Sequence, residues 1–166
     1  MIQGITIKPL ETHNDERGFF TEIFSVNWKD IFIDDIVQAN MSITYPGIIR
    51  AWHKHERGQV DYFIIAKGAA KICVYDEKKE ELNEIISTDK NIQVVRVQGN
   101  YWHGFKAISN EPTTMIYFVS KLYDPKNPDE IRRPWNDQKI IPRKINDRID
   151  DPRCNKPWDW LSPPYK

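Results

Sequence analysis

The stretch Val60-Asp61-Tyr62-Phe63-Ile64-Ile65-Ala66 is followed, across Gly68, by Lys71-Ile72-Cys73-Val74-Tyr75, and these two runs decide the fold. Both runs are short and rich in β-branched and aromatic residues, and the glycine between them marks a turn. Further runs of similar length and spacing lie at Ile2–Lys8, Gln93–Val97, Gly104–Ile108 and Thr114–Val119. Regularly spaced short strands predict an all-β sandwich or barrel rather than a sheet of βαβ units.

The helical signal is thin, and the chain shows no internal repeat and no interdomain linker. Only Asn27–Ile36 is expected to form a short helix or turn. A chain of 166 residues is long enough to bury a full core by itself. We therefore expect a single domain over residues 1–166.

The segment after Asp124 differs in composition from the rest of the chain. It holds most of the eleven prolines, and proline cannot donate a hydrogen bond within a central strand. We therefore expect this segment to be irregular and to lie on the barrel or on a neighbouring subunit. It also contains Trp135, Trp158 and Trp160, which are too apolar to leave in water, so we expect it to be docked and not disordered.

Charge and composition exclude several classes of function. Lys plus Arg and Asp plus Glu number 24 each, so the net charge is zero, whereas a general binder of nucleic acid or anionic membranes needs a basic excess. No apolar run approaches the ~18–20 residues of a membrane span, and the charged N-terminal residues do not resemble a signal peptide. The two cysteines are Cys73 and Cys154. Because Cys73 lies in an apolar run, we expect a buried thiol there. The presence of only two cysteines favours a reducing, cytoplasmic location.

Three of the four histidines indicate a small-molecule site. His53 and His55 are two residues apart, so on a strand their side chains lie on the same face. His103 lies beside another predicted strand, and Arg50 and Asp61 are close in sequence to the first pair. A single histidine is more often a structural hydrogen-bond donor. Three of them among charged side chains favour a ligand site at the mouth of a barrel.

Six segments resemble, in order along the chain, motifs of one enzyme family. They are Asp15-Glu16-Arg17-Gly18-Phe19-Phe20-Thr21-Glu22, Gln38-Ala39-Asn40-Met41-Ser42, Ile49-Arg50-Ala51-Trp52-His53, Tyr101-Trp102-His103-Gly104-Phe105, Tyr117 with Leu122-Tyr123-Asp124-Pro125, and Trp135-Asn136-Asp137. On these segments the chain is similar to the dTDP-4-dehydrorhamnose 3,5-epimerases of the cupin superfamily. The resemblance implies an antiparallel β jelly roll and a homodimer. It also implies a nucleoside-diphosphate 4-keto-6-deoxysugar as substrate, with no cofactor and no metal.

The resemblance further implies a role for each matching residue. In this family a base removes protons from the carbons next to a C4 ketone, and an acid returns the proton on the other face; His53 matches the base and Tyr117 the acid. The enolate oxygen needs a positive or donor group, which Arg50 and His103 would supply, and a guanidinium can bind diphosphate oxygens bidentately. The residues that match substrate-binding positions are Arg17, Phe19, Glu22, Gln38, Asn40, Arg50, His103 and Tyr123.

Three positions depart from the family pattern. Asp61 occupies the place of a usual lysine, and Ile72 that of an acidic residue. A carboxylate cannot stabilise an enolate as an ammonium can. The aspartate that usually orients the base has no clear counterpart either, and the candidates are Asp147, Asp150 and Asp151.

These departures leave two alternatives open. His53, His55, Asp61 and His103 resemble the metal-binding motif of other cupins, whose N and O ligands suit Fe, Mn, Ni or Zn, and this would indicate a metal-dependent isomerase or oxygenase. A non-catalytic cupin that binds sugar nucleotides is the other alternative. The sequence favours a metal-free epimerase, because the motifs outside the histidines match a nucleotide-sugar site that a generic metal cupin does not need.

Overall fold

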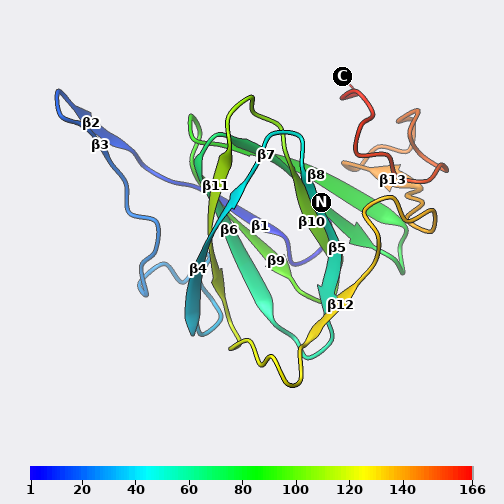
Figure 1. Cartoon of the computed structure of the whole chain (residues 1–166), viewed down its shortest axis with the longest axis horizontal. Coiled ribbons are helices and arrows are strands. Elements are labelled where there is room, and N and C mark those ends of the chain that lie inside the picture. Colours follow the sequence, from blue (N-terminus) through cyan, green and yellow to red (C-terminus); the bar gives the residue numbers. More distant parts are fainter. Residues whose placement is uncertain (166) are drawn as a thin grey trace.

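The computed structural model describes residues 1–165 and contains two packed sheets and one hairpin (Figure 1). The five-stranded sheet has the order β1-β9-β6-β11-β4, the six-stranded sheet the order β12-β5-β10-β7-β8-β13, and β2 pairs with β3. The strands are β1 Thr6–Pro9, β2 His13–Asp15, β3 Gly18–Phe20, β4 Gln38–Thr44, β5 Ile49–His55, β6 Val60–Lys67, β7 Ala69–Asp76, β8 Glu81–Thr88, β9 Gln93–Gln98, β10 Trp102–Ala107, β11 Thr113–Val119, β12 Glu130–Arg132 and β13 Lys144–Ile145. Every pairing is antiparallel except that of β13 with β8. The expected all-β, antiparallel jelly roll is confirmed.

The main core lies between the two sheets. Phe63 and Met115 of the five-stranded sheet meet Ile72, Val74 and Phe105 of the six-stranded sheet in one buried cluster. The outer faces are covered as well, by residues of the 21–37 segment on the first sheet and by the C-terminal segment on the second. Because β6 and β7 are buried on both faces, their sequences are continuous apolar runs rather than alternating ones.

The Asn27–Ile36 segment forms turns, and residues 1–165 contain no α-helix. Ile31 and Phe32 insert into the outer face of the five-stranded sheet. Asp34 then fixes the segment, since its carboxylate accepts hydrogen bonds from Tyr62 Oη at 2.5 Å and from Arg96 Nη2 at 2.7 Å. Of the two predicted outcomes, helix or turn, the turn is the one observed.

The first predicted strand begins later than the sequence pattern suggested. Ile2–Lys8 alternates apolar and polar residues, but the strand is Thr6–Pro9. A turn precedes it, in which the Ile5 amide donates to the Ile2 carbonyl and Gly4 has φ of 89°. Glycine adopts this left-handed conformation without strain, so the turn takes residues that the alternation had assigned to the strand.

The C-terminal segment is docked, as expected, through two of its three tryptophans. Trp158 and Trp160 are buried against the outer face of the six-stranded sheet, whereas Trp135 is 42% exposed. The segment is irregular except for β13, which pairs with β8. Cys73 and Cys154 are both buried free thiols, which confirms the buried thiol expected at Cys73.

The β2–β3 hairpin extends away from the barrel (Figure 1). Its side chains are exposed, including Phe19 at 58% and Phe20 at 63%. The hairpin therefore presents two neighbouring apolar side chains to solvent. Among residues 1–165 no helix is long and apolar enough to cross a membrane.

Candidate active site

A cavity of about 600 Å³ opens between the two sheets. One wall is formed by β4, β6 and β11 of the five-stranded sheet, and the facing wall by β5 and β10 of the six-stranded sheet. The segment from Lys121 to Arg133, which includes β12, closes one side. Volume, enclosure and mixed lining are those of a small-molecule site.

Strand alternation places the histidines in this cavity. On β5 the side chains of His53 and His55 face inward, whereas Trp52, the residue before His53, joins the outer tryptophan cluster. Across the ladder His53 pairs with His103 on β10 and with Arg132 on β12. The expectation that His53, His55 and His103 meet near one end of the barrel is confirmed.

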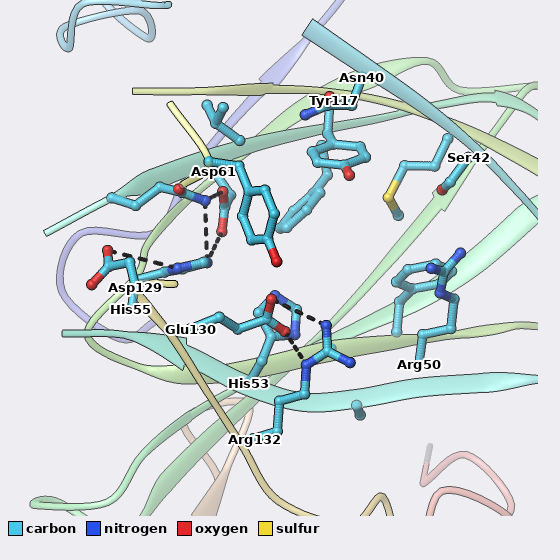
Figure 2. Close-up of a pocket in the computed structure, with 18 of the residues that line it drawn as sticks. Asn40, Ser42, Arg50, His53, His55, Asp61, Tyr117, Asp129, Glu130 and Arg132 are labelled. Carbon is cyan, nitrogen blue, oxygen red and sulfur yellow. Dashed lines mark hydrogen bonds and ion pairs between the residues drawn. The ribbon is translucent and has the colours of Figure 1, made fainter. Parts of the chain in front are cut away.

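The facing wall carries the second predicted catalytic residue. Tyr117 on β11 lies directly opposite Asn40 on β4, and both line the cavity. Along β4 the even-numbered polar residues turn inward, with Gln38 donating to Asn40 at 2.6 Å. Figure 2 shows Tyr117 and Asn40 on one side of the cavity, and Arg50 and His53 on the other.

The environment sets opposite protonation states for the two predicted catalytic groups. Burial, with the nearby charge of His103, lowers the pKa of His53 well below its ordinary value of 6.5. Burial likewise raises the pKa of Tyr117 above 10.0. At neutral pH the cavity therefore presents a neutral imidazole, which can accept a proton, and a protonated phenol, which can donate one.

A buried charged cluster lies behind His53. Asp61 Oδ2 lies 3.2 Å from His55 Nε2 and 3.0 Å from His103 Nε2, and Gln59 Nε2 donates to the other oxygen at 2.7 Å. Burial acts to raise the pKa of Asp61, but the hydrogen bonds from the two histidines hold it far below its usual value. For His55, burial acts to lower the pKa, but the hydrogen bond and the charge of Asp61 outweigh it. The pKa of His55 is therefore raised.

His103 differs in position from what its expected role requires. It is completely buried, lies beneath His53 with 4.1 Å between ring centroids, and is not among the residues that line the cavity. Direct contact with a substrate oxygen is therefore not supported. Arg50 does line the cavity and is the remaining candidate of the two for that contact.

Three predicted substrate-binding residues lie away from this cavity. Arg17 and Phe19 are on the β2–β3 hairpin and Glu22 follows it, and none of them lines the cavity of its own chain. Arg17 instead pairs with Asp15 at 2.5 Å. The sequence pattern carries no information on the distance of these residues from His53.

The three candidate aspartates for orienting His53 are wrong. Asp147 pairs with Lys144 and the N-terminal amine, Asp150 with Arg148, and Asp151 with Arg153. All three belong to the C-terminal segment on the outer face of the six-stranded sheet, whereas His53 faces inward. Across a sheet these groups cannot reach its ring.

The structure adds acidic and basic residues that the sequence analysis missed. Glu130 and Arg132 of β12 line the cavity beside His53 and pair with each other at 2.7 Å (Figure 2). Asp129 lies 3.8 Å from His55 Nδ1. This stretch lies between prolines and has no strand periodicity. Its several charged residues were therefore the only feature of the sequence that could have indicated its position beside β5.

Four residues form a group with suitable donors for a metal ion. One donor atom each from His53, His55, Asp61 and His103 lies within 4.8 Å of the others. Imidazole nitrogens and a carboxylate oxygen are ligands that divalent transition metals accept. The set is the one that the sequence had indicated for the metal alternative.

The fold and the cavity together define an antiparallel β-barrel protein with a site for a small polar molecule between its sheets. Comparison with known proteins gives the family. Residues 13–131 match the family model described as the polysaccharide biosynthesis C-terminal domain. A probable low-salt glycan biosynthesis epimerase of Haloferax volcanii is 38% identical over 81% of this chain and 89% of its own. A spore coat polysaccharide biosynthesis protein of Bacillus subtilis is 34% identical over 84% and 94%.

Solved structures agree with this assignment at the level of the fold. The dTDP-6-deoxy-D-glucose-3,5-epimerase of Legionella pneumophila aligns with a TM-score of 0.72 and 22% identity, over 82% of this chain and 76% of its own. The chain belongs to the polysaccharide biosynthesis C-terminal domain family and is a divergent member of the dTDP-4-dehydrorhamnose 3,5-epimerase group, a carbohydrate epimerase. The resemblance inferred from its motifs is confirmed.

Proposed function

We propose that the chain epimerises a nucleoside-diphosphate 4-keto-6-deoxysugar, with His53 as the base and Tyr117 as the acid. The observation that carries this proposal is the placement of the two groups on facing walls of one cavity, in complementary protonation states. Inversion at carbon requires removal of a proton from one face and its return to the other. Two groups on opposite sides of the sugar ring can do this without moving the substrate.

The reaction begins with the sugar ring between the two walls. His53 takes the proton from a carbon next to the ketone, and the electron pair moves onto the ketone oxygen as an enolate. Arg50 lines the same wall and supplies a cation for that oxygen. Tyr117 then gives its proton to the opposite face of the carbon, and the carbonyl re-forms. Proton exchange with water restores the two side chains.

The nucleotide is proposed to extend from the sugar toward Gln38, Asn40 and Tyr123, which also line the cavity. The dTDP moiety is favoured because the Legionella epimerase was solved with dTDP-4-keto-L-rhamnose, and a 3'-monoepimerase of Streptomyces bikiniensis with dTDP. The relatives from Haloferax and Bacillus are named for glycan and spore coat polysaccharide biosynthesis. We accordingly propose a role in building a deoxysugar for such a polymer.

We further propose that the protein acts as a homodimer. Arg17, Phe19 and Glu22 match substrate-binding positions but lie on or next to a hairpin that extends away from its own barrel. We propose that in the dimer these residues of one copy approach the cavity of the other. Sedimentation velocity is the test, and a monomer at micromolar concentration would contradict it.

The two buried free thiols agree with a reducing, cytoplasmic location.

The experiment that tests the assignment of the base compares His53→Ala with His13→Ala. His13 is an exposed histidine outside the cavity, so its variant controls for loss of an imidazole. With a dTDP-4-keto-6-deoxyhexose, His53→Ala is expected to lower the rate of epimer formation by roughly two to four orders of magnitude, the usual contribution of a general base. Equal rates in the two variants would exclude His53 as the base.

A further inference from the structure

We propose that Arg132 on β12 is a further catalytic residue, whose guanidinium contacts the ketone oxygen of the sugar and stabilises the enolate together with Arg50. Glu130 on the same strand is its positioning residue and holds that guanidinium in one orientation. This inference rests on the proposed function and deepens it, because it adds to the reaction a cation from a strand that lies outside all the motifs of the sequence analysis.

The proposed reaction places a negative charge on one oxygen. When His53 takes the proton, the electron pair of that C–H bond moves onto the ketone oxygen, and it returns when Tyr117 gives its proton to the carbon. A charge that develops only during the reaction is stabilised best by a cationic donor already fixed beside that oxygen. The buried Asp61 carboxylate cannot act in this way, so the basic residues of the cavity are the candidates.

Two of the basic side chains in the cavity wall are already engaged elsewhere. Besides the histidines, the wall includes four basic residues, Arg50, Lys121, Arg132 and Arg133. The Lys121 amine donates to the Arg57 carbonyl oxygen. Arg133 donates to Glu77 at 2.6 Å and stacks 4.1 Å from the ring centre of Trp102, which belongs to the outer cluster. The arginines of β5 and β12 are therefore the two that can reach a substrate.

Of these two arginines, Arg132 lies closer to His53. It is the direct partner of His53 in the pairing of β12 with β5, and the Cβ atoms of such partners lie ~4.5–5.5 Å apart on one face of a sheet. Ile131, the residue before it, packs on the outer cluster, so Arg132 faces the cavity. Arg50 is three residues from His53 along β5, which is about 10 Å at ~3.3 Å per residue. The two cations thus approach a sugar at His53 from different directions (Figure 2).

Glu130 fixes the plane of the Arg132 guanidinium. Nε donates to one carboxylate oxygen at 2.7 Å and Nη2 to the other at 3.2 Å, which is the bidentate geometry that orients a guanidinium most firmly. Nη1 makes no hydrogen bond to residues 1–165. The Arg132 side chain is 78% exposed and that of Glu130 21%. The cation is therefore oriented on one edge and open to a ligand on the other.

The two charges of this pair also act on the proposed acid and base. Burial and the charge of His103 are the main causes that lower the pKa of His53, and the charge of Arg132 acts in the same direction. Burial is the main cause that raises the pKa of Tyr117, and the charge of Glu130 adds to it. The pair thus lies within electrostatic reach of both groups and favours the protonation states that the reaction needs.

The test is steady-state kinetics of the full-length protein with a dTDP-4-keto-6-deoxyhexose. Arg132→Ala should lower kcat about 100- to 1000-fold, the usual cost of removing one donor to such an oxygen, with a much smaller change in KM. Arg132→Lys should fall between the two, because an ammonium keeps the charge but lacks the planar fork. The matched control is Arg143→Ala, since Arg143 is likewise paired with a glutamate, Glu80, but lies outside the cavity; it should keep the wild-type kcat.

Two measurements separate a catalytic role from a structural one. Millimolar guanidinium chloride should restore part of the kcat of Arg132→Ala, whereas sodium chloride at equal ionic strength should not. Glu130→Gln should lower kcat by a smaller factor in the wild-type background and hardly at all in the Arg132→Ala background, because its effect passes through Arg132. An exposed ion pair contributes little to stability, so the Tm of Arg132→Ala should stay near that of the wild type; if it does not, Arg132→Met takes its place.

The outcomes distinguish this inference from the proposed function. An active wild-type protein with full kcat in Arg132→Ala would overturn the role of Arg132 alone. A raised KM with unchanged kcat would also overturn it, because Arg132 would then bind the ground state and the transition state equally. A wild-type protein that leaves the sugar unchanged would overturn the proposed function, and this role of Arg132 with it.

Discussion

Removal of the Tyr117 hydroxyl should separate the two halves of the reaction. Tyr117→Phe keeps the ring that packs beside the core cluster, and the hydroxyl makes no hydrogen bond to residues 1–165. The variant should therefore lose less than about 1 kcal/mol of stability. Return of the proton to the opposite face should slow by roughly two to four orders of magnitude, the range for loss of a general acid.

His53 is unchanged in this variant and should still remove and restore a proton on its own face. The measurement is NMR of a dTDP-4-keto-6-deoxyhexose in deuterated water. We expect deuterium to enter next to the ketone with retention of configuration, while the inverted epimer accumulates slowly. Wild-type yield of the inverted epimer would refute the role of Tyr117. If the Tm falls by far more than loss of one hydroxyl explains, the variant reports on folding rather than catalysis, and Tyr117→His is measured in its place.

The remaining predictions concern pH, the C-terminal segment and the hairpin. Because burial lowers the pKa of His53 below 6.5, the base stays neutral as pH falls past that value, so kcat/KM should hold its plateau well below pH 6.5; a decline that begins above pH 7 would contradict this. Trp160 is 1% exposed and packs on Trp52 at 4.8 Å, so Trp160→Ala should lose about 3–5 kcal/mol in urea unfolding; a loss as small as that of the half-exposed Trp135→Ala would show that the segment is not docked. Arg17→Ala should weaken dTDP binding in calorimetry by about 10- to 100-fold, whereas Arg143→Ala, another exposed arginine, should not; unchanged affinity in the first would remove the hairpin from the site.

The sequence predicted the strands best where burial on both faces leaves an unbroken apolar run. β6 and β7 are such strands, and the glycine between them marks their turn. The N-terminal strand was placed less well, since a glycine turn shortens it. The motif residues on β4, β5 and β11 were brought into one cavity as expected, because strand alternation alone fixes the face on which a side chain lies.

Other parts of the site depend on contacts that no local pattern records. Asp147, Asp150 and Asp151 were candidates for orienting the His53 ring because of their order along the chain. The C-terminal segment that holds them packs on the outer face of the six-stranded sheet, away from that ring. Asp129 and Glu130 reach the cavity because β12 pairs with β5, a pairing between segments with no shared periodicity. The contacts of Asp61 could not be predicted from the sequence either. The structure shows that His55 and His103 both face the same oxygen of its carboxylate.

The most direct test of the central claim is solvent exchange catalysed by the wild-type protein. A dTDP-4-keto-6-deoxyhexose is incubated in deuterated water with the protein, and deuterium at each sugar carbon is measured by NMR and mass spectrometry. We predict incorporation at a carbon adjacent to the C4 ketone, together with the inverted epimer, and none at carbons remote from it. A substrate that binds but returns without deuterium and without inversion would contradict epimerisation by proton transfer at this site.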